Sequence, residues 1–168
     1  GTGKGEGFTV NIPLPAGTRD REYKMAFKSV VFPLMKAYAP DVFILELGMD
    51  ALANDPLAHL QLTNNTHADI IQMVLKLDRP VLATGGGGYH IANTTRGWAL
   101  AWSILCGDDG SDAAVGMGGV MLGNREWAGG LRDRALPFHS DQDDRIATEI
   151  HAVCARIQEK VFPLHGIR

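Results

Sequence analysis

The sequence predicts an α/β protein in which a parallel sheet is flanked by helices. Up to residue 105, segments with strand and helix patterns alternate in the order strand, helix, strand, helix, strand, helix. Two of the expected strands, at residues 42–47 and 81–83, are short and almost entirely apolar, which is typical of parallel strands buried on both faces. Such alternation favours crossover connections and a layered fold, and a sheet of three strands would have exposed edges.

The first strand is predicted over residues 8–14, where apolar and polar side chains alternate. Pro13 and Pro15 lack an N–H donor, so they place this strand at a sheet edge or at its own end. A helix follows, with Thr18 as its expected N-cap and an Ala-Pro pair at residues 39–40 as its end. The apolar face of this helix recurs every three or four residues: Tyr23, Phe27, Val30, Leu34 and Tyr38.

The next elements continue the alternation after the strand at residues 42–47. A helix is expected with Thr63 as its N-cap and an apolar stripe that reaches Leu77. The strand at residues 81–83 then leads into four glycines at 85–88 and a further helix from about Ile91 to Leu105.

The pattern weakens beyond Cys106. Residues 113–138 are rich in glycine and show no clear period, so we expect them to be irregular. Apolar residues at helical spacing then predict a closing helix: Ile146, Ile150, Val153, Ile157 and Val161. The domain interpretation is a single α/β unit over 1–168, in which the irregular segment and the closing helix occupy 106–168.

Composition excludes several classes of protein. The chain has 168 residues and a net charge of −3, with Lys and Arg scattered along it, which argues against a nucleic-acid surface. No apolar run approaches the roughly 20 residues that a membrane span needs, so no membrane association is expected. The two cysteines, Cys106 and Cys154, form no CxxC pair and are expected to be free thiols in a reducing, cytoplasmic compartment.

Two polar side chains follow neighbouring strands of the predicted sheet. Asp50 comes three residues after Leu47, and Tyr89 follows the strand that ends near Ala83. Ligands of open parallel sheets bind beyond the carboxyl ends of the strands, so both side chains should emerge at one edge. Asp50 is a candidate oxygen ligand for a metal or, alternatively, a turn or cap carboxylate. Tyr89 is a candidate donor to a developing oxyanion or, alternatively, an ordinary packing residue.

The glycine run at residues 85–88 lets the backbone approach a ligand closely. It is either such a site or a plain turn. A phosphate cradle is disfavoured, because the sixth position of a GxGxxG motif beginning at Gly85 is His90, and no Gly-Lys-Ser/Thr follows. The six histidines show no ligand spacing, and each is expected at the surface or at a helix cap: His59, His67, His90, His139, His151 and His165.

Three stretches of the chain, taken together, resemble a known family. They are residues 8–14 with the nearby Gly17 and Tyr23, residues 46–63 with the motif Glu-Leu-Gly-Met-Asp-Ala-Leu, and residues 85–98 with the motif Gly-Gly-Gly-Gly-Tyr. Their order and spacing are similar to the histone deacetylase superfamily, which includes acetoin-utilisation proteins and acetylpolyamine amidohydrolases. The resemblance covers about residues 3–105.

The resemblance implies an arginase-like fold and the hydrolysis of an acetyl amide, of the acetyl-lysine or acetylpolyamine type, by a zinc-activated water. By the same resemblance, Asp50 is one of the two zinc-binding aspartates and Tyr89 is the tyrosine that donates to the carbonyl oxygen. Leu57 matches a wall residue of the substrate tunnel, and the backbone of Gly87 lines the tunnel floor. The implied partner is an acetylated amine.

The sequence also departs from the family pattern. The family's Asp-x-His pair, which supplies the other two zinc ligands, and its tandem histidines, which supply the general base, do not occur in this sequence. We expect both upstream of Gly1, so that this chain is the C-terminal portion of a deacetylase domain, inactive alone and able to self-associate through its exposed sheet edges. Alternatives are a non-catalytic module, or a phosphate- or nucleotide-binding module that uses the Gly85–Gly88 loop.

Overall fold

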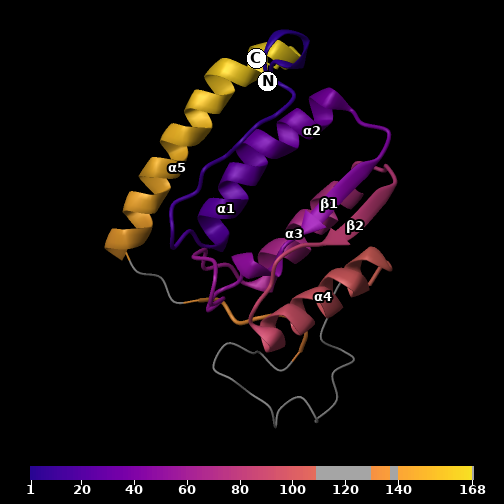
Figure 1. Cartoon of the computed structure of the whole chain (residues 1–168), viewed down its shortest axis with the longest axis vertical. Helices are drawn as coiled ribbons and strands as arrows, with labels where there is room; N and C mark the ends of the chain where they lie inside the picture. Colours follow the sequence, from indigo (N-terminus) through magenta and orange to yellow (C-terminus); the bar gives the residue numbers. More distant parts are fainter. Residues whose placement is uncertain (109–129, 137–139, 168) are drawn as a thin grey trace.

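The computed structural model describes residues 1–108, 130–136 and 140–167. Figure 1 shows the described helices side by side, with α5 on one side of the molecule, α1 and α2 beside it, and α3, the sheet and α4 beyond. The two ends of the chain meet, and His165 Nε2 lies 2.9 Å from the carbonyl oxygen of Gly7. Within these residues, no helix combines the length and apolarity needed to span a bilayer.

The sheet consists of β1 (Phe43–Leu47) and β2 (Val81–Gly85), which pair in parallel. The register pairs Phe43 with Val81 and Leu47 with Gly85, and α3 (Asn64–Leu75) forms the connection between the two strands. These elements, together with α4 (Ile91–Leu105), confirm the predicted α/β class and the predicted bounds of the last helix in the alternation.

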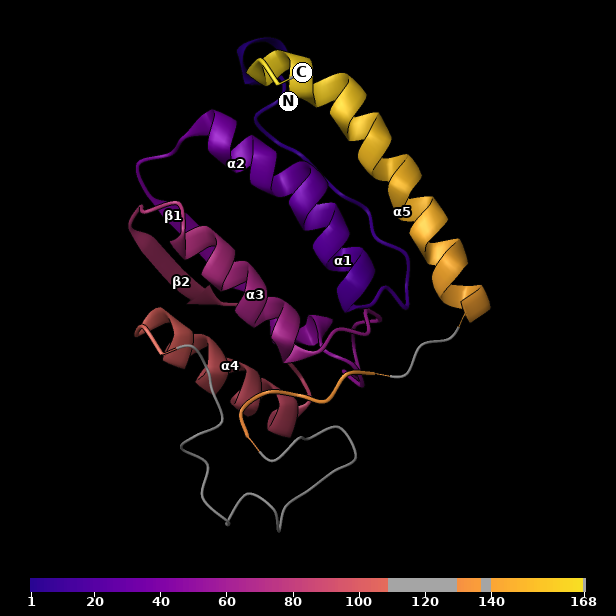
Figure 2. The same cartoon turned by 180° about the vertical axis from the view of Figure 1, so that it is seen from behind.

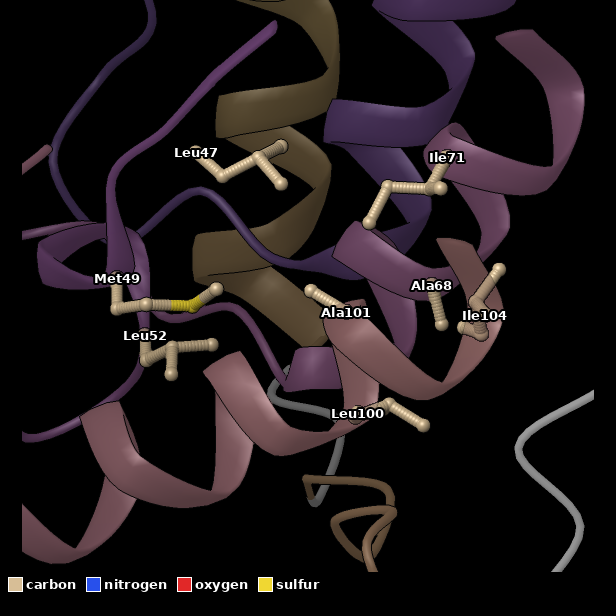
Figure 3. Close-up of a cluster of buried hydrophobic side chains, with 8 residues drawn as sticks. All are labelled: Leu47, Met49, Leu52, Ala68, Ile71, Leu100, Ala101 and Ile104. Carbon is tan, nitrogen blue, oxygen red and sulfur yellow. The ribbon is translucent and has the colours of Figure 1, made fainter. Parts of the chain in front are cut away.

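One face of the sheet is buried under α3 and α4. Figure 3 shows the cluster of buried side chains that joins the end of β1, the loop after it and both helices. The cluster comprises Leu47, Met49, Leu52, Ala68, Ile71, Leu100, Ala101 and Ile104. The opposite face differs from the prediction, because Ile44 and Leu82, a cross-strand pair, are 70% and 55% exposed to solvent. The expectation that both strands are covered on both faces is therefore wrong for the described residues.

The strand predicted over residues 8–14 is not found in the described part of the chain. This segment is extended, but instead of pairing with a strand it packs Val10, Ile12 and Leu14 against α5 (Ser140–Val161) and its neighbours. An extended chain that lies on helices buries every second side chain just as a strand does, so the same alternation arises. Pro13 removes a donor that a sheet ladder would need.

The predicted helix after residue 18 is interrupted once. α1 (Asp20–Ala26) continues into η2, a π-helical turn at Phe27–Val31, and then into α2 (Phe32–Tyr38). Pro33 lies at the start of α2, where its missing N–H prevents a regular α-helical bond to the preceding turn. The helix ends before Ala39, which adopts the left-handed conformation with φ of 48°.

Neither threonine that was predicted as an N-cap caps its helix with its own side chain. Thr18 is buried, and its hydroxyl donates to the carbonyl oxygen of Pro15 at 2.7 Å. Thr63 precedes α3, but its hydroxyl donates to Asp20 Oδ2 at 2.5 Å, and its N–H donates to Asp20 Oδ1 at 2.7 Å. The Asp20 carboxylate of α1 therefore binds the N-cap residue of α3, which fixes the two helices against each other.

The closing helix is confirmed as α5 (Ser140–Val161), followed by the short η6 (Phe162–His165). A second buried cluster joins α5 to α1 and η2: Ala26, Val30, Ile146, Ile150, Cys154 and Ile157. Seen from behind, α5 lies along the outer side of α1 and α2 (Figure 2). At the other end of the chain, η1 (Gly3–Gly5) is a single turn.

Most of the segment predicted to be irregular lies outside the described residues, but residues 130–136 are described and contain no helix. This short segment docks onto α3 and α4. The Asn64 side chain donates to the Leu131 carbonyl oxygen at 2.7 Å and accepts from the Asp133 N–H at 2.9 Å. Arg96 on α4 forms an ion pair with Asp133, with Nη2 2.6 Å from Oδ1.

Candidate active site

The candidate site lies at the carboxyl edge of the sheet, where β1 and β2 end as paired neighbours at Leu47 and Gly85. Asp50 lies in η3 (Met49–Ala51), one short turn after β1, and Tyr89 follows the glycine run after β2. The two connecting loops are joined directly, because the Met49 N–H donates to the carbonyl oxygen of Gly87 at 2.7 Å. The structure therefore brings both loops to one edge, as parallel strands require.

Asp50 and Gly87 are in close contact. A Cβ atom placed on Gly87 would lie 2.3 Å from Asp50 Oδ2 and 2.5 Å from Asp50 Cγ, so only glycine allows this approach. The Asp50 side chain is half-buried, with its carboxylate against the backbone of the glycine loop. The resemblance pairs these same two positions as a metal ligand and a tunnel-floor glycine, and the structure places them next to each other.

The site rests on a buried methionine. Met49 is fully buried and packs into the cluster shown in Figure 3. A Cβ atom on Gly97 of α4 would lie 2.6 Å from Met49 Sδ, so this glycine admits the methionine between the sheet edge and the helix. Because Met49 is adjacent to Asp50, this packing fixes the backbone from which the carboxylate projects.

Tyr89 and Leu57 lie on the open side of the site. Their exposed fractions are 52% and 66%, so neither side chain is part of the described core. This exposure argues against the alternative in which Tyr89 is an ordinary packing residue. Leu57 lies in the loop between η3 and α3, and its backbone is hydrogen-bonded to the same carboxylate as the backbone of Tyr89.

That carboxylate is Asp55, which lies within the stretch of residues 46–63 that resembles the family but was not predicted as a site residue. Its Oδ1 accepts the N–H groups of Leu57 at 2.8 Å and Ala58 at 3.1 Å, and its Oδ2 accepts the N–H of Tyr89 at 2.8 Å. Burial acts to raise the pKa of Asp55, but backbone hydrogen bonds, including one from His90, outweigh it and hold the pKa below the usual value. The Asp-Pro sequence is a turn signal that could have identified the first two of these bonds.

His67 is a second residue whose contact was missed. Its Nε2 lies 3.0 Å from the carbonyl oxygen of Gly48, two residues before Asp50. Burial lowers the pKa of His67, and this outweighs the bond to Gly48 and nearby carboxylates, which act in the opposite direction. The imidazole is therefore neutral near neutral pH, and its Nε2–H donates to the carbonyl.

His90 is the histidine that caps a helix, as the sequence predicted for some of the six. Its Nδ1 accepts the Asn93 N–H at the start of α4.

The described residues do not support a phosphate cradle at the glycine run. Arg96 is the nearest cation in the sequence after this loop, but it is paired with Asp133, and the Gly87 carbonyl is occupied by the Met49 N–H. A catalytic zinc ion takes three protein ligands and a water. Among the described residues, no three His, Cys, Asp or Glu side chains are grouped to hold a metal, so Asp50 alone does not fit a zinc ion.

Comparison with known proteins assigns the family. The model of the histone deacetylase domain matches residues 1–105, which is more than half of the chain. The chain belongs to the histone deacetylase family. This confirms the resemblance drawn from the three motifs.

Curated relatives agree over the same region. Human histone deacetylase 1 is 39% identical over 104 residues, which cover 62% of this chain and 22% of the human protein. Histone deacetylase clr6 of Schizosaccharomyces pombe is 34% identical over 109 residues, covering 65% of this chain and 27% of the yeast protein. Histone deacetylase 8 of Xenopus tropicalis is 34% identical over 107 residues, covering 64% and 29%. The chain thus spans about a quarter of the length of these relatives.

The fold similarity reaches further along the chain than the family match. A solved structure described as the crystal structure of the HDA15 HD domain superposes with a TM-score of 0.67 at 22% sequence identity. It covers 96% of this chain and 39% of that chain. At this identity the likeness shows the fold alone, and it supports the deacetylase-like arrangement of sheet and helices.

Proposed function

We propose that this member of the histone deacetylase family takes part in the zinc-dependent hydrolysis of an acetyl amide of the acetyl-lysine or acetylpolyamine type. The observation that supports this most directly is the contact between Asp50 and Gly87 beside the loop that carries Tyr89. Three positions that the family motifs assign to metal binding, substrate binding and oxyanion stabilisation thereby meet at one sheet edge.

In this proposal each residue has one role. The Tyr89 hydroxyl donates to the oxyanion that forms when the acetyl carbonyl is attacked. Leu57 provides an apolar wall for the alkyl stem of the acylated amine, and the Gly87 backbone forms the floor beneath it. Asp50 is one zinc ligand, and the remaining ligands belong to residues outside these 168. Bound zinc would supply the polarising charge and the activated water.

The ligand role of Asp50 predicts a change in metal content. In the full-length protein, Asp50→Asn should lower the zinc content well below one equivalent, because a neutral amide is a weaker ligand than a carboxylate. Elemental analysis of the purified protein measures this. Asp69→Asn is the matched control, because Asp69 lies on α3 in an ion pair with Lys24. Equal zinc in Asp50→Asn and the unmodified protein would refute the ligand role.

We also expect the 168-residue chain to be inactive when it is produced alone. A catalytic zinc ion needs three protein ligands, and the described residues offer Asp50 but no group of three His, Cys, Asp or Glu side chains. Acetyl-lysine peptides and acetylpolyamines should therefore be recovered unchanged after incubation with the chain. An assay for liberated acetate measures this. Acetate release that a chelator abolishes would contradict this part of the proposal.

The isolated chain is proposed to self-associate, or to accept the remainder of its domain, through its exposed sheet edges. The adjoining sheet face, where Ile44 and Leu82 are paired and open to solvent, supports this proposal. A cytoplasmic location is proposed, and the free thiols of Cys106 and Cys154 are compatible with it.

A further inference from the structure

The Asp55 carboxylate joins two loops that lie far apart in the sequence. One oxygen, Oδ1, accepts N–H groups from its own turn, at Leu57 and Ala58. The other, Oδ2, accepts the N–H of Tyr89 at 2.8 Å, 34 residues away. Asp55 is 9% exposed, and hydrogen bonds to an ionised acceptor are stronger than those to a neutral one.

The position of Tyr89 depends on its backbone. Tyr89 as a residue is 52% exposed, and the residues before it, Gly86–Gly88, have no side chains with which to pack. The nearest backbone anchors on either side are the Met49–Gly87 bond and the backbone of His90, which also bonds to Asp55. Between these anchors, the bond to Asp55 Oδ2 is the contact that fixes the Tyr89 amide within the described residues.

We propose that Asp55 is a positioning residue for the deacetylation step, because its two oxygens set the distance between the Tyr89 hydroxyl and the loop that carries Leu57. This inference rests on the proposed function. An oxyanion donor works only within a narrow range of positions, and a displacement of about 1 Å can cost about 100-fold in rate. Asp55 touches neither substrate nor metal in this scheme, and it acts through Tyr89.

The chemistry of the bridge requires a carboxylate. An asparagine has the same size but only one acceptor oxygen, so it can serve the turn at Leu57 or the Tyr89 N–H but not both. With its oxygen kept on the turn, its NH₂ group would face the Tyr89 N–H, and two donors would oppose each other. Asp55→Asn therefore separates the bridging role from the turn.

The first measurement uses the 168-residue chain and needs no activity. In Asp55→Asn, amide hydrogen exchange at Tyr89 should become about tenfold faster or more, while exchange at Leu57 and within α3 stays the same. The unchanged amides show that the variant is folded. Faster exchange at Leu57 in place of Tyr89 would mean that the asparagine oxygen stays on Tyr89, whereas equal exchange at both amides in the two proteins would overturn the bridge.

The second measurement uses the full-length protein and a double-variant cycle. Asp55→Asn should lower kcat for an acetyl-lysine peptide about 100-fold, with KM within about twofold and zinc content unchanged. In a Tyr89→Phe background the same change should lower kcat less than about twofold, because the group it positions is already gone. Fully additive effects would show that Asp55 does not act through Tyr89, and would overturn the inference.

The two failures are distinguishable. If the unmodified full-length protein releases no acetate, the proposed function fails, while the exchange measurement still reports on the bridge. If Asp55→Asn does not fold, Asp55→Glu replaces it, because glutamate keeps both oxygens and displaces the Tyr89 anchor by one methylene. A fall in kcat with unchanged Leu57 exchange then supports the inference, and an unchanged kcat overturns it.

Discussion

Tyr89→Phe in the full-length protein is expected to lower kcat for acetyl amide hydrolysis about 100- to 1000-fold, equivalent to about 2.7–4 kcal/mol. The effect should fall on kcat, with little change in KM, because the hydroxyl bonds mainly to the charge that develops in the transition state. Steady-state kinetics with an acetyl-lysine peptide and with an acetylpolyamine measure both parameters.

The structure makes loss of folding a weak explanation for such a result. Tyr89 is 52% exposed, so removing its hydroxyl leaves no buried group without a partner. Tyr38→Phe is the matched control, because Tyr38 is similarly exposed, at 59%, but lies at the end of α2 against Phe8. An unchanged kcat in Tyr89→Phe would remove this residue from the mechanism and would leave the family assignment intact.

The sheet edge could be predicted from the sequence for a simple physical reason. The two strands are continuous apolar runs bounded by turn residues, and they are separated by a helical stripe, so a parallel crossover is the economical arrangement. Residues just after the two strands must then share an edge. This logic places Asp50 and Tyr89 in neighbouring loops without any knowledge of the family, whereas their chemical roles come only from the resemblance.

The segment at residues 8–14 shows where periodicity stops being informative. A period of two reports that alternate side chains are buried, and it does not report what buries them. Here the burying surface is formed by α1, η2 and α5, and no ladder forms within the described residues. Pro13 and Pro15 were interpreted as marking a sheet edge or a strand end, and this is wrong for the described residues, because the segment pairs with no strand.

Residues that act across long sequence separations were also missed. The turn made by Asp55 is visible as Asp-Pro, but its bond to Tyr89 depends on the packing of loops 34 residues apart. Asp20 on α1 is a second example, since the expected cap of α3, Thr63, donates both its N–H and its hydroxyl to this carboxylate. In Asp55 the local turn accounts for the bonds to Oδ1, whereas the bond to Oδ2 comes from a distant loop.

Asp133→Ala is expected to lower the free energy of unfolding of the chain by about 3–5 kcal/mol. Asp133 lies beyond the residues that the family model matches, in a segment without a regular pattern, yet its side chain is only 9% exposed. Its Oδ1 lies 2.6 Å from Arg96 Nη2 and 3.0 Å from Arg96 Nε, and its Oδ2 accepts the Asn64 N–H at 3.0 Å. Removing the carboxylate leaves the Arg96 guanidinium, whose side chain is 13% exposed, without its charged partner.

Urea unfolding of the 168-residue chain measures this loss, which should lower the midpoint without changing the slope. Asp69→Ala is the control, because the Lys24–Asp69 pair has a similar length of 2.9 Å but side chains that are 29% and 40% exposed. Exposed pairs contribute about 0–1 kcal/mol, so the two variants should differ by severalfold. Equal losses would mean that burial of the Arg96 pair carries no energetic weight. A large difference would show that residues 130–136, which no motif identifies, hold α3 and α4 together. Arg96 also donates to the Asn93 side chain, whose amide donates to the Ala53 carbonyl oxygen. The ion pair is thereby connected to the loop that carries Asp55.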